Sequence, residues 1–129
     1  MTISWQEIQN HTREIGCNAF SGCGIKWYQK QKTSILRSVD GTPYYDDDMS
    51  DPDNIKYTLF GPNDNQNKKE RKFNDPLLTK SEHIFVYRKI KKGHYIWYGK
   101  YKIIDETSKI WPGKNGNMRT IIILSLKRI

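Results

Sequence analysis

Apolar and polar side chains alternate along several short stretches of the chain, and this pattern predicts a protein built mainly of strands. Residues 33–39 alternate in this way, and the turn signal Asp40-Gly41 follows them. The run from Ile121 to Leu124 is apolar on both faces, which predicts a strand buried on both sides. Further strands are expected near residues 24–27, 55–60, 84–90, 95–98, 102–104 and 119–127.

Two helices are expected beside these strands. Ser4 and Glu7 have the spacing of a capping box, and apolar residues then recur at helical spacing until Gly16. The sequence therefore predicts an N-terminal helix over residues 4–15. Asn74-Asp75-Pro76 combines capping residues with a proline suited to the first turn, so a short second helix is expected there.

Length and charge narrow the class of protein. The 129 residues suit one domain, which we expect to span residues 1–129. No apolar run approaches the ~18 residues of a membrane helix, and the N-terminus does not resemble a signal peptide. We therefore expect a soluble intracellular protein, cytoplasmic if its source is prokaryotic. A net charge of +8 with 12% aromatic residues favours a polyanionic partner, and nucleic acid is the first candidate.

Metal and nucleophile chemistry find little support in the sequence. Cys17 and Cys23 form no Cys-x-x-Cys pair, and the three histidines are far apart. An EF-hand starting at Asp46 is excluded, because its twelfth position is Tyr57 and not glutamate. A metal-dependent nuclease would need a lysine or histidine placed against the carboxylates, and no spacing singles one out. We therefore predict neither a cofactor, nor a metal, nor catalytic residues.

The segment from Tyr45 to Thr58 is the strongest candidate for a binding site. It has a tyrosine near each end and an acidic, proline-containing middle that cannot form a regular strand. Two aromatic faces can enclose a planar ring, and a carboxylate between them can accept hydrogen bonds from an exocyclic amine. The alternative is a solvated hairpin loop whose two tyrosines belong to the core, and this segment alone leaves both open.

The spacing Tyr45, Asp48, Tyr57-Thr58 resembles the base pocket of the SRA (YDG) domain family, which binds DNA by flipping a modified cytosine. The resemblance extends from Thr33 to Arg128 and includes the stretch W-P-G-K-N-G at residues 111–116, which is similar to a W-P-x-x-G stretch of the family. It implies that Tyr45 and Tyr57 sandwich the base, that Asp48 binds its Watson–Crick edge and that Thr58 forms the pocket wall. The acidic residue of the family's Y-D-G signature is absent at residues 98–101.

A lysine-rich loop follows the acidic segment. Residues 61–73 are too polar to form a core and carry Lys68, Lys69, Arg71 and Lys72. A solvated loop is the simplest interpretation. The resemblance instead implies that these side chains contact the DNA backbone or groove beside the vacated base.

The resemblance also implies a fold and a function. The fold is expected to be α+β and mainly β, a PUA-like curved barrel with helices outside. The expected partner is double-stranded DNA containing 5-methylcytosine or 5-hydroxymethylcytosine, bound by a recognition module of a modification-dependent restriction system. Any nuclease activity would lie in another domain or subunit, and whether the chain is a fragment or a complete binding protein stays open. RNA or single-stranded nucleic acid is the alternative partner, because stacking pockets suit both.

Overall fold

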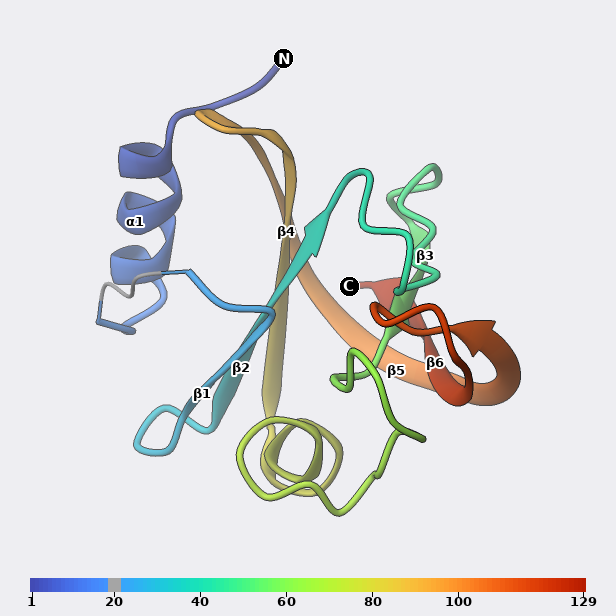
Figure 1. Cartoon of the computed structure of the whole chain (residues 1–129). Coiled ribbons are helices and arrows are strands. Elements are labelled where there is room, and N and C mark those ends of the chain that lie inside the picture. Colours follow the sequence, from blue (N-terminus) through green and yellow to red (C-terminus); the bar gives the residue numbers. More distant parts are fainter. Residues whose placement is uncertain (19–21) are drawn as a thin grey trace.

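Six strands form one curved sheet in this computed structural model, which describes residues 1–18 and 22–129 (Figure 1). The strand order is β1-β2-β4-β5-β6-β3, and only β2 and β4 run parallel. The elements are α1 (Trp5–Glu14), β1 (Ile25–Tyr28), β2 (Thr33–Val39), β3 (Asn54–Thr58), the helix η1 (Pro76–Lys80), β4 (His83–Lys91), β5 (His94–Pro112) and β6 (Met118–Arg128). The predicted α+β, mainly β fold is confirmed.

Helix α1 begins where the capping box predicts. The Ser4 hydroxyl accepts from the Glu7 amide at 3.2 Å, and the Glu7 carboxylate accepts from the Ser4 amide in return. The helix buries Ile8 against Ile35, Tyr87 and other residues of a small cluster on one face of the sheet. Burial of this apolar stripe stabilises the helix far more than its own propensity would. The predicted N-terminal helix is therefore confirmed as a packed part of the domain.

The larger core lies on the other face of the sheet. It is formed by fully buried aliphatic side chains of β2, β4 and β6, with Leu77 of η1 packed among them. The short helix predicted after Asn74 is present, but its central turn is a π-helix, and its N-cap Asp75 makes no side-chain capping bond. The Asn74 amide side chain instead bonds the backbone of Phe60 and Asn67, which ties the basic loop to the core.

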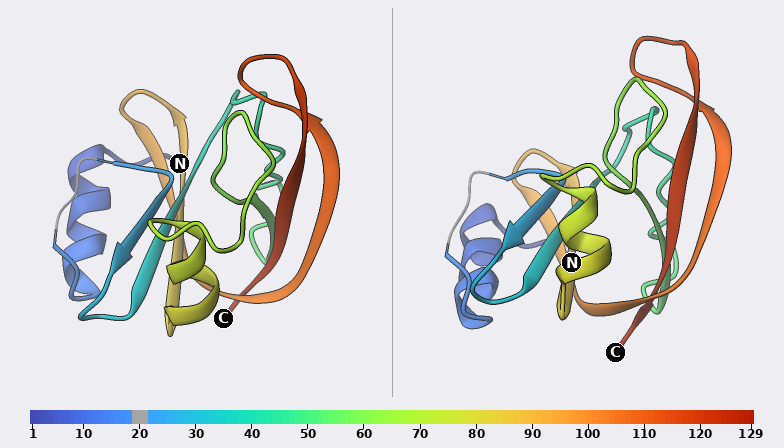
Figure 2. Two further views of the ribbon diagram at one scale, coloured as in Figure 1. Left: turned by 60° about the horizontal axis from the view of Figure 1, so that its bottom comes forward. Right: turned by 90° about the horizontal axis from the view of Figure 1, so that it is seen from below.

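Strands β5 and β6 form a long, curved hairpin, and both views of Figure 2 place the loop after β3 beside it. The sequence predicted separate strands near 95–98 and 102–104, whereas β5 is continuous over 19 residues. A register shift between Ile103 and Asp105 bends it without ending it. At the tip, the Lys114 amide donates to the Pro62 carbonyl at 2.7 Å. The hairpin therefore reaches from the core to the loop that carries the basic residues.

The sequence predicts no membrane-spanning helix. Within residues 1–18 and 22–129, neither helix is long and apolar enough to cross a membrane.

Candidate base-binding pocket

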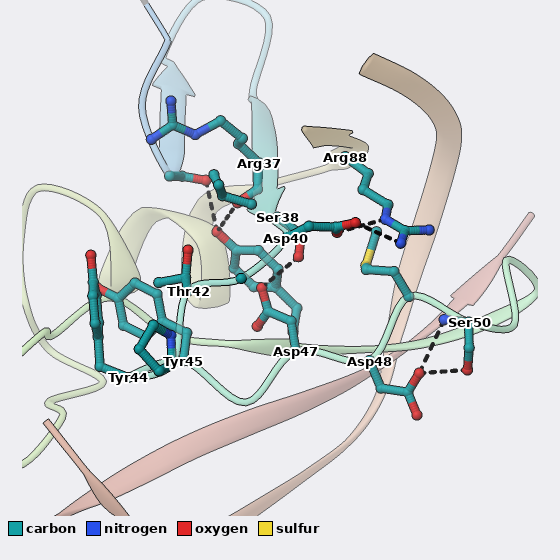
Figure 3. A pocket seen from close by; sticks show the side chains of 16 residues that line it. Arg37, Ser38, Asp40, Thr42, Tyr44, Tyr45, Asp47, Asp48, Ser50 and Arg88 are labelled. Atoms are coloured by element: carbon teal, nitrogen blue, oxygen red, sulfur yellow. Dashed lines mark hydrogen bonds and ion pairs between the residues drawn. The ribbon is translucent and has the colours of Figure 1, made fainter. Parts of the chain in front are cut away.

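A cavity of about 600 Å³ opens between the end of β2, the acidic segment after it, β3 and β4 (Figure 3). Three of the residues that the sequence predicts for a base pocket, Tyr45, Asp48 and Tyr57, line it. The fourth, Thr58, is not among the lining residues, although its backbone and hydroxyl fix the acidic segment from behind. The structure thus brings the predicted residues together around one space.

Asp47 is the carboxylate that the fold holds inside this cavity. Its Oδ1 accepts from the Thr58 amide at 2.7 Å, and its Oδ2 accepts from the Ser38 hydroxyl at 2.7 Å. Burial raises the pKa of the Asp47 carboxyl, although both hydrogen bonds oppose that rise. Because a carboxylate can accept about four hydrogen bonds, each oxygen keeps a lone pair for a ligand. Asp47 is a prepositioned hydrogen-bond acceptor, and it is not among the pocket residues predicted from the sequence.

Asp48 lies at the edge of the cavity and faces solvent. Its backbone pairs with Lys56 of β3, donating at 3.0 Å and accepting at 2.9 Å, so residues 47 and 48 follow strand alternation. Neighbouring side chains of a strand point to opposite sides, and here the Asp47 side chain points into the cavity. The Asp48 carboxylate accepts from the Ser50 hydroxyl and amide, and these bonds lower the pKa of Asp48.

Tyr57 forms one wall of the cavity. Its side chain is 4% exposed, and its hydroxyl donates to the Gly24 carbonyl at 2.7 Å. This bond links β3 to the segment before β1, at the two edges of the sheet. Burial raises the pKa of Tyr57, so the hydroxyl stays protonated and keeps donating. The ring is part of the core and also lines the cavity, and its stacking on a base stays a prediction.

Tyr45 lines the cavity beside Tyr44, and Figure 3 shows both on the far side of Asp47 from Arg88. The two rings meet at a centroid distance of 4.8 Å with their planes tilted by 59°. The Tyr45 hydroxyl accepts from the Gly61 amide at 3.2 Å, and Lys114 lies 5.9 Å from the centre of the Tyr44 ring. Both tyrosines line the cavity, so either ring can serve as the second aromatic surface.

The Arg119 side chain holds the backbone of this tyrosine pair in place. The side chain is 3% exposed, and its guanidinium donates to the carbonyls of Tyr44, Gly61 and Pro112 at 2.6–3.1 Å. No carboxylate of the described residues forms an ion pair with it. Arg119 is not among the site residues predicted from the sequence. Arg119 is two residues before the buried Ile121 in β6, so both side chains point to the same face of the strand. This spacing is the signal that could have identified a cation at a core position.

The basic loop stays outside the cavity. Lys68, Lys69, Arg71 and Lys72 are all exposed, and none of them lines the cavity. Lys68 pairs with Glu106 of β5 at 3.3 Å, and the Lys72 ammonium lies 5.4 Å from the centre of the Phe73 ring. Their contact with DNA stays a prediction.

Metal ligands are not gathered in this region. Among residues 1–18 and 22–129, no group of three or more histidine, cysteine, aspartate or glutamate side chains could hold a metal ion.

Comparison with known proteins identifies the fold. No family model and no curated protein matches the chain. Among solved structures, the sulfur-binding and SRA domains of ScoMcrA, complexed with phosphorothioated DNA, align over 100% of this chain and 39% of theirs, with 17% identity and a TM-score of 0.69. The modification-dependent restriction endonuclease TagI aligns over 100% of this chain and 48% of its own, with 19% identity and a TM-score of 0.64.

A third similar structure is that of KRYPTONITE in complex with mCHG DNA and SAH. It aligns over 85% of this chain and 28% of its own, with 18% identity and a TM-score of 0.60. The chain thus spans less than half the length of each of these three proteins. The SRA-like fold that the sequence predicts is confirmed.

Proposed function

We propose that this domain binds duplex DNA carrying a modified cytosine and takes the modified base out of the stack into the cavity. The observation that carries the proposal is the Asp47 carboxylate, held by Thr58 and Ser38 beside the Tyr57 ring within an SRA-like fold. A net charge of +8 supports a polyanionic partner. Two of the similar structures contain modified DNA: that of ScoMcrA contains phosphorothioated DNA and that of KRYPTONITE contains mCHG DNA, and the latter supports a modified base as the ligand.

The cavity walls supply energy for extracting a base. Unstacking a nucleotide costs a few kcal/mol, and stacking a base on an aromatic ring returns ~1–3 kcal/mol. Tyr57 is only 4% exposed, so it offers a base the part of its ring that lines the cavity, and its hydroxyl bond to Gly24 fixes that ring. Tyr45 and Tyr44, which are partly exposed, line the same cavity and provide the second surface. Two such contacts are of the size needed to offset the cost.

Asp47 is the residue that we assign to the Watson–Crick edge of the base. An ionised carboxylate accepts from the amine of cytosine and repels the carbonyl that thymine carries at the same position. Asp48, which the resemblance to the family favours, stays the competing candidate. Its carboxylate is exposed and already bonded to Ser50, so binding a base would require it to turn inward.

The domain would act as a recognition module and not as the enzyme. Structural similarity to the modification-dependent endonuclease TagI supports a role in a restriction system, with the nuclease in another domain or subunit. Exposed Lys68, Lys69, Arg71 and Lys72 would contact phosphates and contribute affinity without selecting a base.

The test is a binding panel at physiological salt. Matched duplexes carrying cytosine, 5-methylcytosine or 5-hydroxymethylcytosine at one position are compared, with a single-stranded competitor. Preference for a modified duplex over the plain one and over single strands is expected. Equal affinity for all duplexes would refute the proposal, and preference for single strands would favour the RNA or single-strand alternative.

Two single variants distinguish the carboxylates, because Asp47 and Asp48 are adjacent and chemically identical. Asp47→Ala should weaken modified-duplex binding by at least ~10-fold, the effect of losing a charge-assisted hydrogen bond. Asp48→Ala, the matched control, should change it less than ~2-fold. The reverse result would show that Asp48 binds the base, as the family spacing predicts.

A further inference from the structure

The cavity is larger than a methylated cytosine requires. Its volume of about 600 Å³ lies within the range of small-molecule sites. The base of 5-methylcytosine has fewer than about ten heavy atoms, and even at the ~30 Å³ that a water molecule takes up in the liquid it fills less than ~300 Å³. About half of the cavity is therefore left for something other than the methylated base.

The surplus space has a polar end, made by Asp40 at the end of β2 and Arg88 of β4. The Arg88 guanidinium donates to both carboxylate oxygens of Asp40, with Nε at 2.7 Å and Nη2 at 2.8 Å. Both side chains line the cavity and are only about one-third exposed, at 28% and 32%. Figure 3 shows this pair on the far side of Asp47 from Tyr44 and Tyr45.

The pair shares the cavity with the proposed base-binding carboxylate. Ser38, which bonds Asp47, is two residues before Asp40, and Ser38, Asp40 and Arg88 all line the cavity. In cytosine the exocyclic amine and C5 are neighbouring ring positions. A base whose amine faces Asp47 therefore carries its C5 substituent next to this carboxylate, and in one direction it finds tyrosine rings, in the other the Asp40–Arg88 pair.

Size then separates the substituents. A methyl carbon extends only ~1.5 Å from the ring and leaves most of the surplus space empty. A hydroxymethyl group extends one atom further. A sugar joined to that hydroxymethyl group extends furthest and is large enough to occupy the surplus volume.

The chemistry at this end suits hydroxyl groups. The oxygens of Asp40 keep lone pairs that can accept from hydroxyls, and the Ser50 hydroxyl at the rim, whose hydrogen is donated to Asp48, can also accept. The fork of Arg88 holds the carboxylate in one orientation, and its Nη1 donates to the Tyr98 hydroxyl at 3.2 Å, which fixes Arg88 in turn. A methyl group cannot form hydrogen bonds with these polar atoms.

We propose that Asp40 and Arg88, with Ser50 at the rim, bind the sugar of a glycosylated 5-hydroxymethylcytosine. This inference rests on the proposed function, since it needs the base to enter the cavity with its amine toward Asp47. It names the substrate class: a cytosine whose C5 substituent is large and carries several hydroxyl groups.

The experiment measures wild-type affinity for four matched duplexes, with cytosine, 5-methylcytosine, 5-hydroxymethylcytosine or glucosylated 5-hydroxymethylcytosine at one position. The glucosylated duplex should bind at least ~10-fold more tightly than the methylated one, the effect of one or more charge-assisted hydrogen bonds. Asp40→Ala should remove this gain and leave 5-methylcytosine binding within ~2-fold of wild type.

A matched control is available in Asp53, which forms a similar pair with Arg128 at 2.7 Å outside the cavity. Asp53→Ala should change neither affinity, and melting curves of both variants verify folding, with Asp40→Asn as the replacement if Asp40→Ala unfolds. A wild-type preference for 5-methylcytosine over cytosine combined with exclusion of the glucosylated base would overturn this inference alone. An Asp40 variant that keeps the glucose preference would overturn the assignment of the pair. Equal binding of all four duplexes would overturn the proposed function and this inference with it.

Discussion

Arg119 is the residue whose loss should disturb the pocket most, because it joins three segments that are distant in the sequence. Its guanidinium bonds the Tyr44 carbonyl at 2.8 Å, the Pro112 carbonyl at 2.9 Å and the Gly61 carbonyl at 2.6 Å. These carbonyls belong to the tyrosine end of the cavity, to the tip of the β5–β6 hairpin and to the start of the basic loop. A substitution here therefore tests whether the cavity is organised before DNA arrives.

The magnitude follows from the number of carbonyls left without a donor. In Arg119→Met the apolar stem is kept, whereas the hydrogen bonds to three carbonyls are lost. Hydrogen bonds to a charged group contribute ~1.5–3 kcal/mol each, and their effects do not add fully within one network. We therefore expect a loss of ~3–5 kcal/mol in the free energy of unfolding. For a domain of this size that loss corresponds to a Tm lower by ~10–20 °C.

The assay is thermal unfolding followed by circular dichroism, together with duplex binding at a temperature where each variant is folded. Arg119→Lys keeps the charge but concentrates its donors on one nitrogen, so it should lie between Arg119→Met and the wild type. Arg128→Met, on the same strand but with an exposed side chain that pairs with exposed Asp53, is the control and should hardly move the Tm. If Arg119→Met melts within ~3 °C of the wild type, the three carbonyls do not depend on Arg119 and the reasoning is refuted.

Three further predictions concern the ring, the charges and the acid. Tyr57→Phe keeps the stacking surface and should bind modified duplex within ~3-fold of wild type, whereas Tyr57→Leu should lose ~1–3 kcal/mol of binding free energy by titration; equal losses would mean the ring does not stack. Lys69→Ala should flatten the slope of log K against log salt by ~0.9, and Lys68→Ala by less because Lys68 pairs with Glu106; unchanged slopes would place the loop away from DNA. The pKa of Asp47 is raised by burial, so the folded state binds this proton more tightly than the unfolded state and this carboxyl's contribution to stability falls as pH rises through the raised value. Relative to wild type, Asp47→Asn should thus gain stability with rising pH in melting curves, and a difference that is independent of pH would contradict the shift.

Regular elements could be predicted from the sequence wherever burial imposes a period. β2 begins at Thr33 and ends at Val39, as the alternation indicates, and α1 begins just after its capping residue Ser4. The outer half of β5 was missed, because residues 104–110 are exposed on the structure and carry no apolar period. That half is a strand because backbone hydrogen bonds pair it with β6. Such pairing leaves no pattern of apolar side chains in the sequence, so it could not be predicted.

The π-helical turn of η1 shows a similar limit. Pro76 indicates that a helix begins, but it does not distinguish α from π hydrogen bonding in a turn that packs against β1 and β2. In the structure the Ser81 amide bonds the Pro76 carbonyl at 3.0 Å, five residues earlier, which is the π pattern. Local sequence does not contain this tertiary constraint.

The candidate site divides in the same way between spacing and register. Spacing was sufficient to place Tyr45 and Tyr57 around one cavity, because both flank a segment that must return to the sheet. It pointed to Asp48, whereas the structure holds the neighbouring Asp47 inside the cavity, since a shift of one residue reverses which side chain faces inward. The choice is made by the backbone pairing of Asp48 with Lys56 and by the Thr58 amide, which bonds Asp47.

Thr58 shows how strongly this register is fixed. Its amide donates to the Asp47 carboxylate at 2.7 Å, while its hydroxyl accepts from the Asp46 amide at 2.9 Å. Thr58 itself is 3% exposed and is paired with Ile123 of β6, so the sheet fixes its position. Slippage of the acidic segment by one residue would break both bonds and leave a buried amide without an acceptor, which costs ~1–3 kcal/mol. The inward position of Asp47 is therefore a property of the folded sheet and does not require DNA to impose it.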